Sequence, residues 1–220
     1  MKKSVYSLVL SDDVVRAVDH LAYQKHTSRS NLINQILAEY CSFTTPEKRM
    51  KDIFSFVEDF IMPNEALQVR LQSSDAMMSI RSALRYKYKP TIRYVVELNP
   101  AADRRLGELR VSFRTQNQQL IALLTQFFII WNQLEKQSIG TYFDNGEIPC
   151  EISEGKYRRI FMAPEQALSE EQVGRAIAGY VQMLDQVLKT FFDYMDTPQE
   201  AVRKTEQMYD KLRNHLMPVI

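Results

Sequence analysis

The chain has 220 residues, of which 45% are hydrophobic and 25% charged, and its formal net charge at pH 7 is +1. This length and apolar content argue against a disordered chain and allow a substantial buried core. Cys41 and Cys150 lie far apart in the sequence and lack the short spacing of metal ligands, so neither a disulfide framework nor a zinc site is indicated.

The longest apolar run, residues 120–134, is too short for a membrane helix and contains Thr125, Asn132 and two glutamines. The N-terminus lacks the apolar stretch of a secretion signal. We therefore expect a cytoplasmic protein with no membrane partner.

The first predicted element is a short strand over residues 3–10, in which polar and apolar residues alternate. Tyr6, Leu8 and Leu10 fall on one face, and the opposite face holds Lys3, Val5, Ser7 and Val9. A lone strand cannot satisfy its own backbone groups, and the following residues offer no second strand. An identical strand from a second copy of the chain would provide the missing partner.

Two amphipathic helices are predicted next, joined by residues 26–30. Ser11 is suited to cap the first helix, and Asp12 and Asp13 suit its positive end. We expect this helix to end near His26, which would adopt the left-handed conformation that glycine usually provides. Ser28 is the expected cap of the second helix, whose apolar stripe is Leu32, Ile33, Ile36, Leu37 and Tyr40.

The segments 10–14 (Leu-Ser-Asp-Asp-Val) and 27–33 (Thr-Ser-Arg-Ser-Asn-Leu-Ile), with Asp19 between them, resemble the ribbon-helix-helix family of Arc-, MetJ- and CopG-type repressors. The resemblance covers about forty residues and implies an intertwined dimer, in which paired strands form a ribbon that enters the major groove of DNA. It places the base-facing side chains at Lys3, Val5, Ser7 and Val9. The phosphate-binding helix start would comprise Thr27, Ser28, Arg29 and Ser30.

The predicted base-facing side departs from the family, because Val5 and Val9 carry no hydrogen-bonding group. Direct reading of bases would therefore rest on Ser7 and Lys3. Arg29 has two equally weighted interpretations, a phosphate contact or an ion pair within the chain. The alternative for the whole pattern is a chance succession of one strand and two helices, which is common in α/β proteins.

The remaining residues predict a larger helical domain. Thr45 and Pro46 suit a helix start, which puts a domain boundary near residue 44. Helical periodicity covers 47–61 and 65–87, alternation over 91–98 and 109–113 predicts a β-hairpin, and a strongly apolar helix is expected over 117–137 at the centre of the core. Short strands are expected at 140–143, 147–152 and 156–162. A capping box at Ser169 opens a helix to about 195, and Pro198 opens the last helix.

We find no pattern that indicates catalysis, a metal site or a cofactor. His20, His26 and His215 lack the spacing of metal ligands, and the six glycines form no phosphate-binding loop. The chain is therefore predicted not to be an enzyme, and to use neither metal nor cofactor.

Residues 81–114 carry nine Lys and Arg against three Asp and Glu. Five of the cations lie close together among tyrosines: Arg81, Arg85, Lys87, Lys89 and Arg93. Basic residues among aromatic ones are typical of a nucleic-acid surface. The favoured alternative is a solvated helix end that leads into a strand.

Together these patterns predict a mostly helical α+β protein. Residues 1–44 would form the ribbon-helix-helix domain, and residues 45–220 would form an α+β domain with a hairpin or small antiparallel sheet. The expected function is a homodimeric DNA-binding regulator, a repressor, whose second domain senses a small molecule, binds a protein effector or promotes higher assembly. The alternatives are a plasmid partition or mobilisation accessory protein, and an antitoxin-like interaction module that uses the ribbon only to dimerise.

Overall fold

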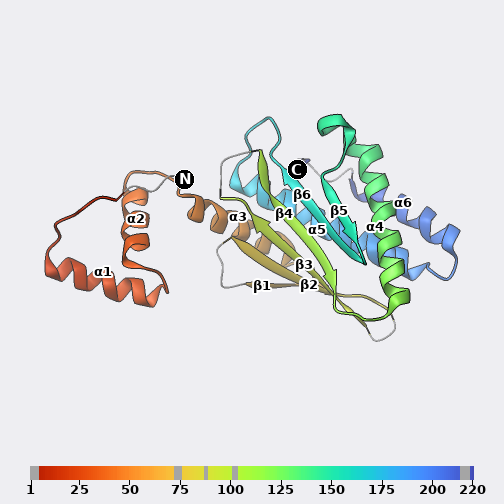
Figure 1. Ribbon diagram of the computed structural model, residues 1–220, viewed down its shortest axis with the longest axis horizontal. Helices are drawn as coiled ribbons and strands as arrows, with labels where there is room; N and C mark the ends of the chain where they lie inside the picture. The colour runs from red at the N-terminus through yellow and green to blue at the C-terminus, as the bar shows by residue number, and fades with distance from the viewer. Residues whose placement is uncertain (1–4, 72–75, 87–88, 101–103, 214–218) are drawn as a thin grey trace. The chain divides into compact units, whose positions relative to one another are not determined.

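A computed structural model describes residues 5–71, 76–86, 89–100, 104–213 and 219–220 (Figure 1). The fold is α+β, and the chain divides into two compact units, Met1–Arg49 and Met50–Ile220. Among the described residues, no helix is both long and apolar enough to cross a membrane.

The first unit contains α1 (Asp12–Gln24) and α2 (Arg29–Tyr40). Its buried core is small and consists of Val18, Ala22 and Leu32, with Ile33 packed against them. The strand predicted over residues 3–10 is not formed in the single chain, because residues 5–10 lie in no regular element and no other described segment of this unit is a strand. As far as the structure describes it, the first unit therefore has two helices and an extended segment without a paired strand.

The turn between α1 and α2 has the conformation predicted from the sequence. The N–H of Thr27 donates to the carbonyl of Ala22 at 2.9 Å, and the N–H of His26 donates to that of Tyr23 at 3.1 Å. His26 has a φ of 49°, which confirms its predicted left-handed conformation. These two bonds form a Schellman motif that ends α1. The Ser28 hydroxyl then accepts the N–H of Asn31 at 3.2 Å, which confirms it as the cap of α2.

The second unit is built on one antiparallel six-stranded sheet with the strand order β1-β2-β3-β4-β6-β5. The strands are β1 (Leu67–Leu71), β2 (Met77–Ala83), β3 (Thr91–Leu98), β4 (Arg105–Phe113), β5 (Cys150–Ser153) and β6 (Lys156–Met162). The helices are α3 (Pro46–Ile61), α4 (Gln118–Ile139), α5 (Glu170–Asp193) and α6 (Pro198–Arg213).

Helices cover one face of this sheet, and the other face is open. Ile92, Tyr94 and Val96 of β3 join the same core as buried residues of α3, α4, α5 and α6. In Figure 1 the sheet lies in front of α5, so the viewer looks onto the open face. Because side chains alternate along a strand, Arg93 and its outward neighbours on every strand share that open face.

Two predicted elements of this unit are wrong. A helix was expected over residues 65–87, but the described residues there include β1 and β2. Pairing of β1 with β2 and of β2 with β3 outweighs the good helix propensity of their Leu, Gln, Arg, Met and Ala residues. Residues 140–143 were expected to be a strand, but Gly140–Tyr142 forms a 3-10 turn at the end of α4. The strand predicted from residue 147 begins only at Cys150.

The other predictions for this unit agree with the structure. The β3–β4 hairpin forms with Ile92 opposite Phe113, although β4 begins at Arg105 rather than at 109. α4 contributes Leu124 and Phe127 to the core, as expected for its apolar sequence. Ser169 and Gln172 form the predicted capping box of α5.

A polar network lies inside the core. Glu135 on α4 and Arg159 on β6 are fully buried and form an ion pair, with 3.3 Å between Nε and Oε1. The hydroxyls of Tyr157 and Tyr180 donate to the other oxygen of Glu135 at 2.7 and 3.0 Å. Arg159 also donates to the main-chain oxygen of Ile220 at 3.1 Å. The carboxylate therefore has three partners, as a buried charge requires.

The buried tyrosines predict a loss of stability at high pH. Burial raises the pKa values of Tyr94, Tyr157 and Tyr180 well above the ordinary value, and it raises the pKa of Tyr209 to about 12. In the unfolded chain tyrosines ionise near pH 10, so above that pH the folded state holds more protons than the unfolded state and stability falls as pH rises. Four such groups give a slope of about 5 kcal/mol per pH unit.

Urea unfolding between about pH 9 and pH 12 measures this slope, which reaches its full value about one unit above the ordinary tyrosine pKa. In Tyr94→Phe one of the four groups is absent, so the slope should fall by about a quarter, since each tyrosine contributes about 1.4 kcal/mol per pH unit. If the wild type and Tyr94→Phe have equal slopes, Tyr94 does not contribute to the loss of stability at high pH.

Candidate nucleic-acid interface

The N-terminal segment presents two faces that differ in exposure. Val5 and Val9 are 99% and 103% exposed, and Tyr6, Leu8 and Leu10 on the other predicted face are 84%, 60% and 40% exposed. The predicted base-facing side chains Val5, Ser7 and Val9 are thus on the surface, and Lys3 lies outside the described residues.

The N-terminal segment borders a hollow of about 760 Å³, to which residues of both its predicted faces contribute. Its apolar lining comprises Val5, Leu8, Val9 and Leu10 of the segment, Val15 of α1, and Ile33 and Leu37 of α2. Further apolar side chains of the unit are exposed: Val14, Leu21, Tyr23, Ile36, Tyr40 and Phe43. This much uncovered apolar surface on a unit of this size is typical of a protein–protein contact.

The predicted phosphate-binding residues surround the start of α2. Ser28 uses its side chain as the helix cap, so that oxygen is already occupied. The N–H groups of Arg29 and Ser30 have no hydrogen-bond acceptor among the described residues, as is usual in the first turn of a helix. These two N–H groups point out of the helix end, where the helix dipole favours an anion.

The Arg29 side chain pairs with Asp19 of α1. Its Nε and a terminal nitrogen donate to the two carboxylate oxygens, both at 2.5 Å. The hydrogen bond from Arg29 lowers the pKa of Asp19 below its ordinary value. Of the two interpretations of Arg29, the ion pair is therefore the one formed in this structure. Both side chains are about half exposed, which leaves the guanidinium accessible to a phosphate.

The basic cluster predicted around residues 81–93 lies on strands rather than at a helix end, so the helix-end interpretation is wrong. Arg81 on β2 stands directly opposite Arg93 on β3. Arg85 and Lys89 are exposed in the connection between these strands, and Lys87 lies outside the described residues.

The two described tyrosines expected among these cations do not share their surface, and Tyr88 lies outside the described residues. Tyr94 points into the core, where its hydroxyl donates to Asp185 at 3.0 Å. Tyr86 packs edge-on against Phe192 with 5.6 Å between the ring centres. As far as the structure describes it, the cluster is therefore cationic without aromatic side chains.

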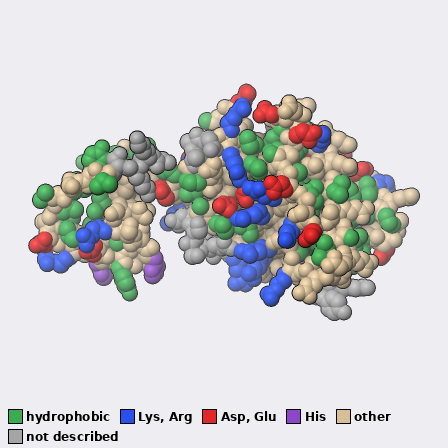
Figure 2. Space-filling view, viewed as in Figure 1, with side chains coloured by type: hydrophobic (Ala, Val, Ile, Leu, Met, Phe, Trp, Pro, Cys, Tyr) green, Lys and Arg blue, Asp and Glu red, His purple; other side chains and the backbone are tan. Residues whose placement is uncertain are grey.

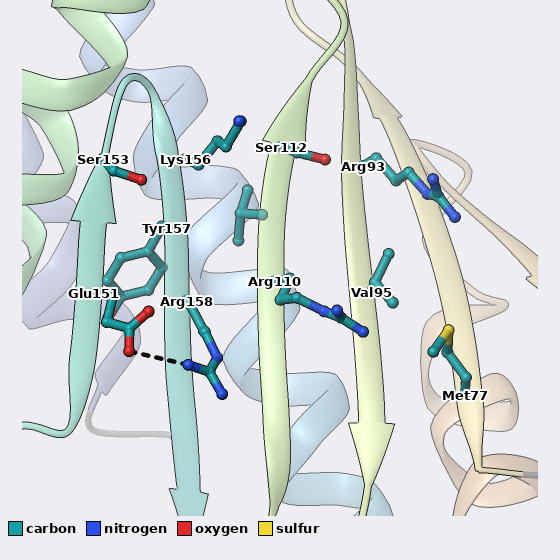
Figure 3. Close-up of a pocket in the computed structure, with 11 residues that line it drawn as sticks. Met77, Arg93, Val95, Arg110, Ser112, Glu151, Ser153, Lys156, Tyr157 and Arg158 are labelled. Atoms are coloured by element: carbon teal, nitrogen blue, oxygen red, sulfur yellow. Dashed lines mark hydrogen bonds and ion pairs between the residues drawn. The ribbon is translucent and has the colours of Figure 1, made fainter.

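The structure brings three further cations, Arg110, Lys156 and Arg158, next to Arg93 of the predicted cluster. Arg93, Arg110 and Arg158 project from β3, β4 and β6 on the open face of the sheet, beside Lys156 (Figure 3). They line a hollow of about 530 Å³. Alternation in the predicted strands 91–98 and 109–113 already placed Arg93 and Arg110 on the side opposite to the core residues, which is the signal that could have found this surface.

Within the described residues, no three His, Cys, Asp or Glu side chains gather closely enough to hold a metal ion. Two surfaces that the described residues offer to a ligand are the N-terminal segment with the start of α2, and the open face of the sheet. Comparisons of the chain with protein-family models, with curated proteins and with solved structures found no match.

Proposed function

We propose that the protein is a homodimeric DNA-binding regulator, a repressor, whose N-terminal segments pair across the dimer as a ribbon that enters the major groove. The observation that carries this proposal is the uncovered apolar face of the first unit. Tyr6, Leu8 and Leu10 alternate with outward residues and meet no strand among the described residues of this unit. An antiparallel copy would satisfy their backbone groups and cover the hollow between the segment and α2.

Dimerisation through this face would leave Val5, Ser7 and Val9 on the outer side of the ribbon. Ser7 can exchange hydrogen bonds with base edges, and the two valines can contact thymine methyl groups. The starts of the two α2 helices would hold phosphates on either side through the N–H groups of Arg29 and Ser30 and through the Arg29 side chain. Phosphate contacts would then provide affinity, and a small apolar reading surface would provide preference for particular sequences.

The test compares Arg29→Ala with Asp19→Ala, because the two residues form one ion pair. If Arg29 contacts phosphate, its loss should weaken binding to all duplex sequences about tenfold, and should reduce the slope of log affinity against log salt by about 0.9 per contact. Asp19→Ala should instead tighten binding, since it releases Arg29 and removes a carboxylate.

Fluorescence anisotropy with the full-length protein and a randomised duplex pool provides the measurement. Ser7→Ala should change which sequences are selected from the pool, with little change in affinity for random duplex. If Arg29→Ala and Asp19→Ala change the affinity for DNA in the same direction, the ion pair between these residues only stabilises the fold and Arg29 does not contact phosphate. Absence of duplex binding at low salt would refute the proposed function.

A second candidate function rests on the same exposed valines. A surface formed by Val5 and Val9 also suits a protein partner, in which case the ribbon would serve dimerisation and the protein would act as an interaction module. Stoichiometric co-purification of a protein that Val9→Asp releases, together with no DNA affinity, would favour this candidate over the regulator.

A further inference from the structure

We propose that the open face of the β-sheet in the second unit is a second DNA-binding surface, which holds the phosphodiester backbone of duplex DNA through a band of cationic side chains. This inference rests on the proposed function and extends it, because it assigns a DNA contact to the unit that lacks the ribbon. We define the cation band as Arg70, Arg81, Arg93, Arg110, Lys156 and Arg158.

The strand register brings these six residues together. On the open face, Gln68, Arg81, Arg93 and Ser112 follow one another across β1, β2, β3 and β4 as paired residues. Lys156 of β6 pairs with Ser153 of β5, and the pairing of Val111 with Tyr157 places Lys156 next in line after Ser112. This row of described residues contains cations, serine hydroxyls and one amide, but no carboxylate.

The neighbouring row on the same face holds the other cations. Arg70 pairs with Ser79, Ser79 with Val95, Val95 with Arg110, and Arg110 with Arg158. Two adjacent rows thus carry every member of the cation band across the sheet. Since neighbouring strands lie about 4.8 Å apart, the band is about 19 Å long from β1 to β6. Figure 2 shows Lys and Arg side chains lying across this face.

Carboxylates neutralise only one part of the band. Arg110 pairs with Glu97 at 2.5 Å, and Arg158 pairs with Glu108 at 2.7 Å and with Glu151 at 3.0 Å. Glu97 and Glu108 stand opposite each other one row further along the strands, so they border the band rather than interrupt it. Their ion pairs hold the two arginines in place on the sheet.

The other part of the band forms no ion pair within the described residues, although Glu65 and Asp193 line a hollow together with Arg70 and Arg81. No carboxylate there forms an ion pair with Arg70, Arg81, Arg93 or Lys156, and Arg93 has only a hydrogen bond to the Ser79 hydroxyl at 3.3 Å. Arg81 and Arg93 also stand directly opposite each other, an arrangement of like charges that destabilises a sheet. An external anion is the group that would relieve this repulsion.

The chemistry of the band favours duplex DNA as that anion. Among the described outward residues of the sheet there is no aromatic side chain, so the face offers no platform on which the bases of a single strand could stack. Arginine forks instead match phosphate oxygens. Over about 19 Å of its axis duplex DNA carries about eleven phosphates, a density of negative charge that an extended row of cations can follow.

The experiment compares two double variants of the full-length protein, each of which removes two positive charges. Arg81→Gln/Arg93→Gln changes the band, and the control Arg203→Gln/Lys211→Gln changes exposed positions on α6. Anisotropy with a random-sequence duplex is measured from about 0.05 to 0.3 M salt. At about 0.1 M salt the affinity of the band variant for DNA should be at least about tenfold weaker than that of the wild type. The slope of log affinity against log salt should also become smaller by about 1.8, because each of the two lost phosphate contacts contributes about 0.9. The control should match the wild type.

Thermal unfolding of the same variants separates a DNA contact from damage to the fold. Removal of the Arg81–Arg93 repulsion should leave the Tm of the band variant equal to or above that of the wild type, while its DNA affinity falls. A band variant that binds DNA as the control does would overturn the inference, as would a lost acidic protein partner with unchanged DNA binding.

The Arg29→Ala variant distinguishes this inference from the proposed function. If Arg29→Ala weakens binding and the band variant does not, the ribbon function stands and the second surface is refuted. If the band variant abolishes binding and Arg29→Ala has no effect, the second surface stands and the ribbon function is refuted. A wild-type protein that binds no duplex at the lowest salt concentration refutes both.

Discussion

Arg159→Met is expected to lower the free energy of unfolding by about 3 to 5 kcal/mol, because it leaves a carboxylate buried without its counter-charge. Arg159 and Glu135 are both fully buried and pair at 3.3 Å. The substitution also removes the donor to the main-chain oxygen of Ile220. Equilibrium urea unfolding of the full-length protein measures the change.

The control is a double-mutant cycle with Glu135→Gln. The amide of a glutamine can still accept from Tyr157 and Tyr180 but carries no charge, so the double variant should be more stable than Arg159→Met alone. We expect a coupling free energy of about 1 to 3 kcal/mol. Additive effects, or a loss below about 1 kcal/mol for Arg159→Met, would contradict the role of this ion pair.

Leu8→Asp is expected to abolish dimerisation and, with it, DNA binding. Under the proposed function Leu8 lies on the ribbon face that packs onto α2, and the two-fold axis places the substitution in the interface twice. Loss of two buried leucines removes about 3 to 6 kcal/mol, and burial of two carboxylates adds to this cost. The dimer dissociation constant should rise at least about a thousandfold. Sedimentation equilibrium of the full-length protein measures it.

Val9→Asp is the matched control, since it makes a similar change one residue away on the opposite face. A strand places neighbouring side chains on opposite sides, so the introduced carboxylate would point outward and leave the dimer intact. It should nevertheless weaken DNA binding, because a negative charge would face the phosphates. If Leu8→Asp remains dimeric, or if both variants dissociate equally, the ribbon arrangement is wrong.

The helices of this protein were predictable because their signals are local. Ser28, and Ser169 with Gln172, cap helices through atoms three residues away, and His26 closes α1 through bonds within one turn. The alternation over residues 91–98 identified β3 for the same reason, since Ile92, Tyr94, Val96 and Leu98 are buried while the neighbouring Thr91 and Arg93 are exposed.

Residues 65–87 were not predictable in this way. Their composition suits a helix, and only the pairing of Val69 with Ile80, and of Ile80 with Tyr94, makes strands of β1 and β2. The segment 3–10 shows the opposite case, because its alternation is clear but the described part of its own unit offers no partner strand. For β1 and β2 the deciding hydrogen bonds connect paired strands, and for the segment 3–10 we propose that they come from a second copy of the chain.

The candidate sites likewise combine features that local sequence specifies with features that only the tertiary structure specifies. The sequence by itself determined the caps and turn that build the start of α2, because these depend on neighbours a few residues away. Only the tertiary structure decided that Arg29 pairs with Asp19, that Glu135 meets Arg159 in the core, and that the cation band lies on one face of a sheet. Those contacts depend on strand register and helix packing, which bring distant residues together by burying apolar surface that no local pattern specifies.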